Sequence, residues 1–307
     1  MSTLNLRGIL LPFTTPFTKD EDLDTRGLRQ NLLHWNQTGI AGYVALGSTG
    51  ERVNLDEREY LEVLEIARAE VPENLTFIAG VGQQSTRQTI NEVRKAAKAG
   101  ADAALVITPS FYRSAITQPA LVAHYTAIAD ASPIPLVLYS MPDLTGITIE
   151  PETTAKLSEH PNIIGVKDSS NNVERLKETL RAVQDDFAVM TGNGTVLYDA
   201  LLAGARGAIL AVGCVAPEMC LRIFAQVRQG NMTLAAALQE KLTPLALVVT
   251  KRYGIGGLKT AMDLTGLQGG SVRAPLKSPS DEARREIAAL LQAVTKENDP
   301  VGLAGAL

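Results

Sequence analysis

Short apolar runs recur along the chain, and stretches with helical periodicity lie between them. The runs are rich in Val, Ile, Leu and Ala and do not alternate with polar residues, which is typical of parallel strands covered on both faces. Their starts lie roughly 20 to 35 residues apart, the length of a strand, a helix and two loops. The pattern predicts eight strands, at residues 9–13, 42–46, 76–81, 103–108, 135–139, 163–167, 187–191 and 207–212.

Eight strands that each precede a helix predict an α/β fold of the TIM (β/α)8 barrel type. An open, doubly wound sheet would also use parallel strands, but the count favours the barrel. Beyond the eighth strand, residues 217–229, 232–251, 258–264 and 280–296 have helical patterns, more than one helix needed to complete a barrel. We therefore expect a barrel carrying the active site over residues 1–230, and a C-terminal helical extension packed on it over residues 231–307.

Two helices have recognisable ends. Segment 54–70 begins with Asn54 in a capping position and has acidic residues in its first turn. Segment 85–100 begins with the capping residue Ser85 and stops at Gly100, a residue type common just beyond a helix end.

Charge and composition limit the function classes. The 307 residues have a formal net charge of −4, so the chain lacks the basic field that attracts nucleic acid, and a small-molecule substrate is the better expectation. No secretory signal is visible at the N-terminus, and no apolar run approaches the roughly 20 residues of a membrane-spanning helix. We expect a cytoplasmic protein with no membrane partner, in which Cys214 and Cys220 are thiols with a packing role.

Candidate chemistry lies at the ends of the predicted strands, where barrel enzymes carry their catalytic groups. These ends bring together one lysine, one tyrosine, and several small hydroxyl and glycine residues. They are Lys167 in IIGVKDSS, Tyr139 in LYSMP, Ser48, Thr49 and Gly50 in GSTGE, and Gly192 and Asn193 in GNG.

Other site types fit these strand ends poorly. A metal-dependent barrel needs two or more His, Asp or Glu ligands there, but His34 and His124 lie in helical stretches and His160 precedes the sixth strand. We therefore expect no metal site. GSTGE lacks the lysine and spacing of a P-loop. The GNG segment after the seventh strand offers a phosphate site, but no nearby Arg or Lys supports that alternative.

The combination of Lys167 and Tyr139 points to imine chemistry. Burial disfavours the charged form of an amine, and a neutral amine attacks a carbonyl carbon to give an iminium that allows the adjacent carbon–carbon bond to break or form. Tyr139 on the neighbouring strand is the expected proton shuttle, and Ser48 relays the proton onward. Taken alone, a lysine after a strand is usually a solvated loop residue, and a tyrosine in a strand is usually a core residue. Their placement on strands of one barrel favours the catalytic interpretation.

With these residues in place, the chain resembles the pyruvate-dependent class I aldolase and lyase family that includes dihydrodipicolinate synthase and N-acetylneuraminate lyase. The resemblance runs from about Leu6 to the C-terminal helices. Residues 47–51 resemble the family's G[ST]TGE motif, Tyr139 its Tyr-X-X-Pro motif, and Lys167 its Schiff-base lysine. The resemblance implies a cofactor-free enzyme acting on pyruvate or another 2-oxo acid, and a homotetramer built as a dimer of dimers.

Within the family, the segments SPIPLVLYSMP, HPNIIGVKDS and GIGGLKTAMDLTGLQGGSVRAPL are most similar to 4-hydroxy-2-oxoglutarate aldolases. Two positions depart from the synthase pattern. Leu144 stands where dihydrodipicolinate synthases carry an arginine for a substrate carboxylate. Phe111, followed by Tyr112, stands where the family supplies a tyrosine across the subunit interface to the proton relay.

The predicted reaction is retro-aldol cleavage of a 4-hydroxy-2-oxo acid to pyruvate and an aldehyde such as glyoxylate. The alternatives are dihydrodipicolinate synthase, a keto-deoxy sugar-acid aldolase or dehydratase, and, in a different class, a non-catalytic protein that binds keto acids. Lys167, Tyr139 and Ser48 are the predicted catalytic residues, and the predicted substrate-binding residues are Thr49, Gly50, Gly192 and Asn193.

Overall fold

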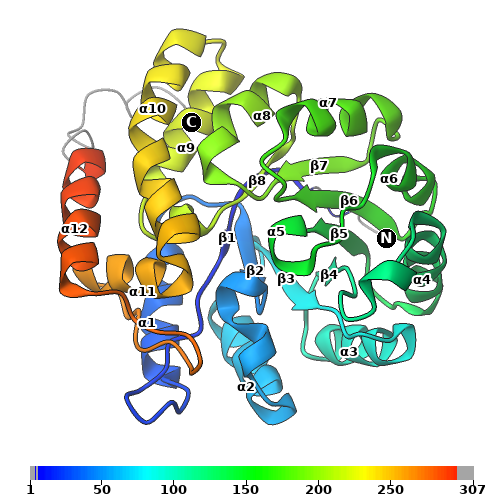
Figure 1. Ribbon diagram of the computed structural model, residues 1–307, viewed down its shortest axis with the longest axis horizontal. Coiled ribbons are helices and arrows are strands. Elements are labelled where there is room, and N and C mark those ends of the chain that lie inside the picture. The colour runs from blue at the N-terminus through cyan, green and yellow to red at the C-terminus, as the bar shows by residue number, and fades with distance from the viewer. Residues whose placement is uncertain (1–3, 5, 296–307) are drawn as a thin grey trace.

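Eight parallel strands close into a barrel at the centre of the computed structural model, which describes residue 4 and residues 6–295 (Figure 1). The strands follow one another around the barrel in chain order, and β8 pairs back to β1. This confirms the predicted TIM-type barrel. The strands are β1 (Gly8–Pro12), β2 (Gly42–Ala45), β3 (Thr76–Val81), β4 (Ala103–Ile107), β5 (Leu136–Ser140), β6 (Ile163–Asp168), β7 (Ala188–Thr191) and β8 (Gly207–Ile209).

Helices surround the barrel and continue beyond it. The first group is α1 (Thr25–Trp35), α2 (Glu57–Glu70), α3 (Thr86–Lys98), α4 (Gln118–Ala131), α5 (Pro142–Thr145), α6 (Pro151–Ser158), α7 (Val173–Ala182) and α8 (Leu197–Ala203). The second group is α9 (Pro217–Arg228), α10 (Met232–Leu247), the π-helical turn η6 (Val248–Arg252), α11 (Gly254–Leu264) and α12 (Asp281–Thr295). Short 3-10 turns include η1 (Ser48–Gly50), η2 (Arg52–Asn54), η3 (Arg113–Ala115), η4 (Gly194–Val196) and η5 (Ala211–Cys214).

The N-terminal cap of α2 differs from the prediction, whereas that of α3 agrees with it. Asn54 does not cap α2, because residues 52–54 form the turn η2; the cap is Asp56, which makes a reciprocal capping box with Glu59. Ser85 caps α3 as predicted, since its side chain accepts a hydrogen bond from the Gln88 backbone N–H. The eighth strand ends at Ile209, earlier than predicted, because η5 follows it.

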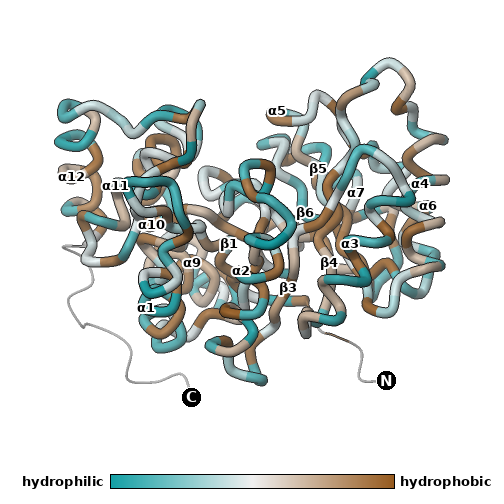
Figure 2. Tube along the Cα trace, turned by 90° about the horizontal axis from the view of Figure 1, so that it is seen from below, coloured by the Kyte–Doolittle hydropathy of each residue, from teal (hydrophilic) through white to brown (hydrophobic). Residues whose placement is uncertain are grey.

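Apolar side chains fill two layers, one inside the barrel and one between the strands and the helices. Leu10, Val44 and Met190 belong to the inner cluster, whereas Ile9 and Leu11 on the same strand as Leu10 belong to the outer one. Burial on both faces explains the unbroken apolar runs, which Figure 2 shows as brown segments in the middle of the molecule. Cys214 and Cys220 are buried free thiols in the outer cluster.

The C-terminal helices lie together on one side of the barrel, where α10 contacts α9 and α12, and α11 contacts α12 (Figure 1). The domain division at residue 230 remains a prediction, and residues 296–307 lie outside the described part.

The segment Met232–Arg252 is long and apolar enough to span a membrane by length and composition, contrary to the expectation that no run approaches this length. Its contacts with α9 and α12 give its apolar face a packing role within this fold.

Candidate active site

Lys167 and Tyr139 lie side by side on neighbouring strands. Tyr139 on β5 is in register with Lys167 on β6, so both side chains point to the same side of the sheet. That side is the barrel interior, since Tyr139 belongs to the inner cluster. The exposed fraction is 4% for Lys167 and 3% for Tyr139, and Lys167 Nζ lies 4.4 Å from the centroid of the tyrosine ring. The lysine is therefore held inside the barrel beside a phenol, out of bulk water.

Ser48 reaches the same phenol from the turn that follows β2. Its Oγ lies 2.9 Å from the Tyr139 hydroxyl, and either oxygen can donate. The turn η1 also contains Thr49 and Gly50, both buried. The Gly50 N–H donates to the Gly47 carbonyl oxygen within the turn. Substrate binding by Gly50 remains a prediction. A helical turn leaves its first N–H groups without internal partners, which are those of Ser48 and Thr49 here.

Gly192 at the end of β7 lies directly against the lysine. A Cβ built on Gly192 would lie 2.7 Å from Lys167 Cε and 1.9 Å from Ser169 Oγ. Any larger residue would therefore collide with the two side chains. Ser169, two positions after the lysine, is buried and takes part in this packing, a role that the sequence pattern did not reveal.

The Asn193 side chain makes hydrogen bonds to Thr195, which its predicted role in substrate binding did not include. Its Oδ1 accepts hydrogen bonds from the Thr195 backbone N–H, at 3.0 Å, and from the Thr195 hydroxyl, at 2.8 Å. These bonds cap the turn η4, so the carbonyl end of the Asn193 amide has a structural role. Substrate binding by Asn193 remains a prediction for its amide nitrogen.

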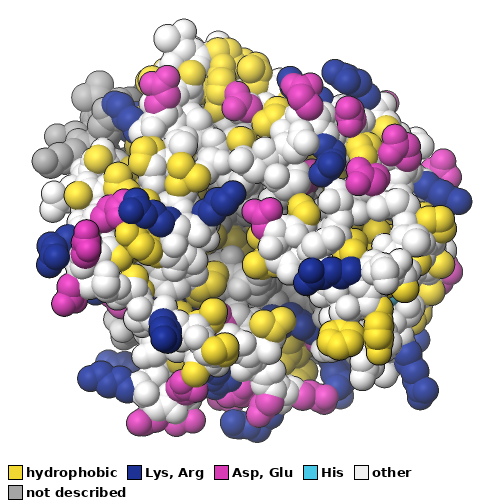
Figure 3. Space-filling model, in the orientation of Figure 1, with side chains coloured by type: hydrophobic (Ala, Val, Ile, Leu, Met, Phe, Trp, Pro, Cys, Tyr) yellow, Lys and Arg dark blue, Asp and Glu magenta, His cyan; other side chains and the backbone are white. Residues whose placement is uncertain are grey.

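Figure 3 looks onto the ends of the strands, where the surface is hollowed near its centre. Leu144 lies in α5, the turn after Tyr139, and is 60% exposed. Phe111 and Tyr112 follow β4, are 75% and 72% exposed, and pack edge to face. Among the residues described, Tyr139 has Ser48 as the hydrogen-bond partner of its hydroxyl, and neither Phe111 nor Tyr112 reaches it within this chain.

The histidines lie away from this site. His34 is on α1, His124 on α4 and His160 before β6. Burial lowers the pKa of His124 to about 4, and its Nδ1 lies 2.8 Å from the Thr86 hydroxyl. Within residue 4 and residues 6–295, no group of three or more His, Cys, Asp or Glu side chains is arranged to hold a metal ion.

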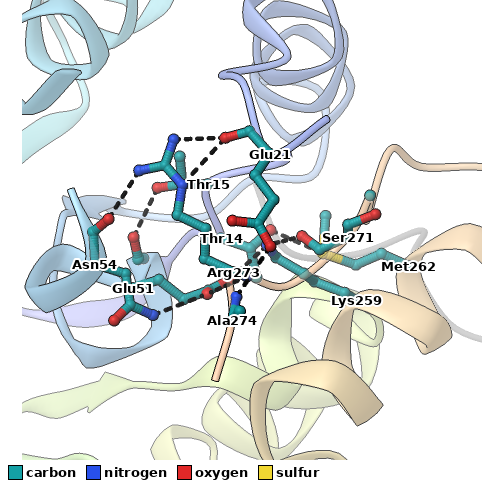
Figure 4. A network of polar contacts seen from close by, with 12 residues as sticks. Thr14, Thr15, Glu21, Glu51, Asn54, Lys259, Met262, Ser271, Arg273 and Ala274 are labelled. Carbon is teal, nitrogen blue, oxygen red and sulfur yellow. Dashed lines mark hydrogen bonds and ion pairs between the residues drawn. The ribbon is translucent and has the colours of Figure 1, made fainter. Parts of the chain in front are cut away.

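A buried charge network lies behind the Ser48 turn, and sequence reasoning missed it (Figure 4). Glu51, the last residue of GSTGE, forms an ion pair with Lys259 of α11, and each side chain is 1% exposed. The only sequence signal is a lysine within the otherwise apolar segment GIGGLKTAM. No local pattern links that lysine to Glu51.

Comparison with known proteins identifies the family. The sequence model of the dihydrodipicolinate synthetase family matches residues 5–294. The chain belongs to this family. It is accordingly a class I, pyruvate-dependent aldolase or lyase, which confirms the family resemblance and the enzyme class inferred from the strand ends.

Several curated relatives share one activity name. The chain is 36% identical to the 4-hydroxy-tetrahydrodipicolinate synthase of Methanothrix thermoacetophila, over 96% of this chain and 98% of the relative. It is 33% identical to the enzyme of the same name from Thermodesulfovibrio yellowstonii, over 93% of this chain and 97% of the relative. These names favour the synthase alternative over the 4-hydroxy-2-oxoglutarate aldolase that we predicted as the main activity.

Solved structures match the whole barrel. Dihydrodipicolinate synthase DapA-2 from Bacillus anthracis superposes with a TM-score of 0.90 at 26% identity, covering 94% of this chain and 99% of that one. YagE, a prophage protein of the family from E. coli K12 in complex with pyruvate, superposes with a TM-score of 0.89 at 28% identity, covering 95% and 99%. A third match, with a TM-score of 0.89 at 28% identity over 94% and 97%, is a monomeric dihydrodipicolinate synthase variant.

Proposed function

We propose that this enzyme forms or breaks a carbon–carbon bond next to pyruvate through a Schiff base on Lys167. The observation that carries the proposal is the buried Lys167 amine beside the Tyr139 ring, with the phenol joined to Ser48. The Lys167 amine can attack a carbonyl carbon, and the nearby phenol can move the protons that imine formation requires.

The geometry supports the following steps. The Lys167 amine attacks the ketone carbon of pyruvate, and Tyr139 delivers a proton to the oxygen that leaves as water. Loss of a proton from the methyl carbon of the iminium gives an enamine, whose carbon attacks an aldehyde; the reverse sequence is retro-aldol cleavage. Ser48 relays protons between Tyr139 and the substrate. The N–H groups of Ser48 and Thr49 are the candidates for holding the pyruvate carboxylate, in the manner of an oxyanion site.

The relatives favour 4-hydroxy-tetrahydrodipicolinate synthase as the reaction, in which the enamine attacks an amino-acid semialdehyde. The support is the shared activity name of curated proteins that are 31–36% identical over nearly the whole chain. Sequence identity at this level supports pyruvate as one substrate more strongly than it supports any particular aldehyde as the other. The choice of aldehyde depends on a few side chains that contribute about 1–3 kcal/mol each.

Leu144 favours a second candidate, aldol cleavage of a 4-hydroxy-2-oxo acid such as 4-hydroxy-2-oxoglutarate. The turn after Tyr139 is where a synthase of this family is expected to present an arginine to a substrate carboxylate, and Leu144 places an exposed apolar side chain there. Loss of that guanidinium removes a charge-assisted hydrogen bond. A sugar-acid dehydratase uses the same imine and differs in eliminating water.

Borohydride trapping tests the shared chemistry. Incubation with pyruvate and borohydride should add an irreversible mass to the peptide containing Lys167, whereas Lys167→Ala should gain no mass and show no turnover. Lys177→Ala, which changes a partly exposed lysine on α7, is the matched control and should behave like the wild type. An unmodified Lys167 in active enzyme would contradict the proposal.

A panel of substrates then separates the candidate reactions. Pyruvate release from 4-hydroxy-2-oxoglutarate identifies the aldolase, and consumption of pyruvate with an amino-acid semialdehyde identifies the synthase. Formation of a deoxygenated 2-oxo acid without pyruvate release identifies the dehydratase.

We also propose that the enzyme works in the cytoplasm as a homo-oligomer, specifically a tetramer built as a dimer of dimers. Support comes from the edge-to-face pair of Phe111 and Tyr112, since two adjacent aromatic side chains that are each more than 70% exposed are typical of a protein interface. Only small molecules are proposed as substrates, with neither nucleic acid nor membrane as a partner.

A further inference from the structure

Glu51 sits at the junction between the Ser48 turn and the C-terminal helices. Its backbone has the left-handed conformation, with φ 53° and ψ 32°, which is uncommon for a residue with a side chain. Its N–H donates to the Ser48 carbonyl oxygen at 3.2 Å and so closes the turn that presents Ser48. The position of Glu51 therefore bears directly on the position of Ser48.

The Glu51 carboxylate is anchored from the C-terminal side of the molecule. Oε1 lies 2.5 Å from Lys259 Nζ, and Oε2 accepts a hydrogen bond from the Arg273 backbone N–H at 3.2 Å. Lys259 Nζ also donates to the Ser271 carbonyl oxygen at 2.6 Å and lies 4.4 Å from the centroid of the Phe17 ring. Figure 4 shows Glu51, Lys259, Ser271 and Arg273 converging from different parts of the chain.

Neighbouring groups hold this arrangement in place. The Arg273 guanidinium pairs with Glu59 at 2.5 Å and lies 4.3 Å from the Phe17 ring centroid. The Thr15 hydroxyl donates to the Gly50 carbonyl oxygen at 2.7 Å, which fixes the other side of the turn. The turn is thus constrained both by the N-terminal segment and by the segment after α11.

The Glu51–Lys259 pair is sensitive to the loss of either member. Burial lowers the pKa of Lys259, and the Glu51 charge opposes that effect. Removing one partner leaves an uncompensated charge in a site from which water is excluded. Well-packed apolar residues can replace many buried ion pairs without loss of stability, so stability alone does not account for a charged pair at this position.

We propose that Lys259 is a positioning residue for catalysis: through the Glu51 carboxylate it holds the Ser48 turn so that the Ser48 hydroxyl stays within hydrogen-bond distance of Tyr139. The proposal rests on the relay role of Ser48 and Tyr139 put forward above. It makes α11, which belongs to the C-terminal helices, a functional part of the active site.

A double-mutant cycle between Lys259 and Ser48 tests this. The measured quantity is the rate of imine formation with pyruvate in a single turnover, trapped by borohydride, together with pyruvate affinity and melting temperature. Lys259→Met should slow imine formation at saturating pyruvate about tenfold in folded enzyme. Pyruvate affinity should also fall, because the same turn presents the Ser48 and Thr49 N–H groups to the carboxylate. In the Ser48→Ala background the same change should cause almost no further loss, because Lys259 acts through Ser48.

Two further variants keep the test decisive if Lys259→Met folds poorly. Glu51→Gln combined with Lys259→Met removes both charges with nearly the same volume and should fold, yet show the same slow imine formation. Arg252→Met is the stability control, since it breaks an ion pair with Glu286 in the same group of helices at a place far more exposed. It should leave the rate unchanged.

The outcomes separate the positioning role from the relay itself. If the losses from Lys259→Met and Ser48→Ala multiply, or if Lys259→Met lowers the melting temperature but leaves the imine rate unchanged, Lys259 is merely structural and the proposal is wrong. If Ser48→Ala alone keeps the full rate, the relay role of Ser48 fails, and the positioning role fails with it.

Discussion

The Ser48 hydroxyl oxygen lies 2.9 Å from the Tyr139 phenol oxygen, although 91 positions separate the two residues in the chain. The barrel brings them together because the end of β2 and the end of β5 lie at the same edge of a closed parallel sheet. If protons pass through this contact, Tyr139→Phe should slow imine formation about 10²–10⁴-fold, and Ser48→Ala should slow it less, because water can replace a hydroxyl. Rapid-quench borohydride trapping measures both rates, and a full rate for Tyr139→Phe would exclude the shuttle role.

Gly192→Ala should impair catalysis through steric contact alone. The new methyl group would meet Lys167 Cε at 2.7 Å and Ser169 Oγ at 1.9 Å, so both side chains must move. We expect imine formation to fall at least about tenfold, because a small displacement of a reacting amine has a large effect on rate. Combining Gly192→Ala with Ser169→Gly removes the closest obstacle and should restore part of the rate. The absence of any rescue would show that Ser169 is not the constraint.

Leu144→Arg should shift the choice of aldehyde. The exposed position in α5 lets a guanidinium reach a carboxylate at the pocket mouth, and a charge-assisted hydrogen bond contributes about 1.5–3 kcal/mol. We expect kcat/KM for an amino-acid semialdehyde, which carries a carboxylate, to rise about tenfold or more relative to that for an aldehyde without a carboxylate, with imine formation from pyruvate unchanged. Leu144→Met is the matched control. An unchanged ratio would remove residue 144 from the determinants of specificity.

His124 should make the fold weaker in mild acid. Its pKa is lowered to about 4 by burial, below the ordinary value of 6.5, so the unfolded chain binds a proton more readily than the folded protein. The neutral form is stabilising above pH 6.5, and that contribution is lost as the pH falls towards 4. At pH 5 the loss is about 2 kcal/mol relative to neutral pH.

Urea unfolding at pH 7 and pH 5 measures this effect. His124→Asn, which keeps a nitrogen or oxygen near Thr86 but does not titrate, should lose about 2 kcal/mol less on acidification than the wild type. His34→Asn, an exposed change on α1, is the control and should follow the wild type. Equal slopes for all three proteins would show that His124 is not protonated on unfolding.

Phe111 and Tyr112 should govern assembly. Replacing both by serine removes two large exposed aromatic side chains and should shift the protein to a smaller species in analytical ultracentrifugation. The side chains pack on each other at a ring distance of 5.0 Å and are otherwise exposed, so the melting temperature of the smaller species should reflect lost assembly and not a damaged core. A double variant with unchanged mass would place the interface elsewhere.

The sequence predicts the barrel well because strand order and strand ends are repeating features. All eight strand positions are close to those predicted, and the meeting of Lys167 with Tyr139 follows once both are placed at the ends of parallel strands. The sequence pattern places the N-cap of α2 at Asn54 instead of Asp56, because both are capping residue types. The turn η2, which includes Asn54, decides between them. Such a choice depends on backbone geometry that composition does not encode.

Contacts between side chains far apart in the chain could not be predicted. Nothing in the pattern around Lys259 names Glu51 as its partner, and nothing in GNG shows that Gly192 must leave space for Lys167 and Ser169. The capping of η4 by the Asn193 side chain could not be predicted either, because a side-chain amide uses the same atoms to cap a turn and to bind a ligand. These relationships arise from packing in three dimensions and not from periodicity.

The registered pair of Tyr139 and Lys167 has an implication for how this enzyme can change over evolution. Both residues belong to strands inside a closed sheet, so their separation is inherited with the barrel itself. Leu144 and Phe111 lie outside the strands, where insertions and substitutions are tolerated. New aldehyde substrates can therefore be acquired by changing the segments that follow the strands, while the step that activates pyruvate stays intact. A designer seeking a new product should alter these segments first.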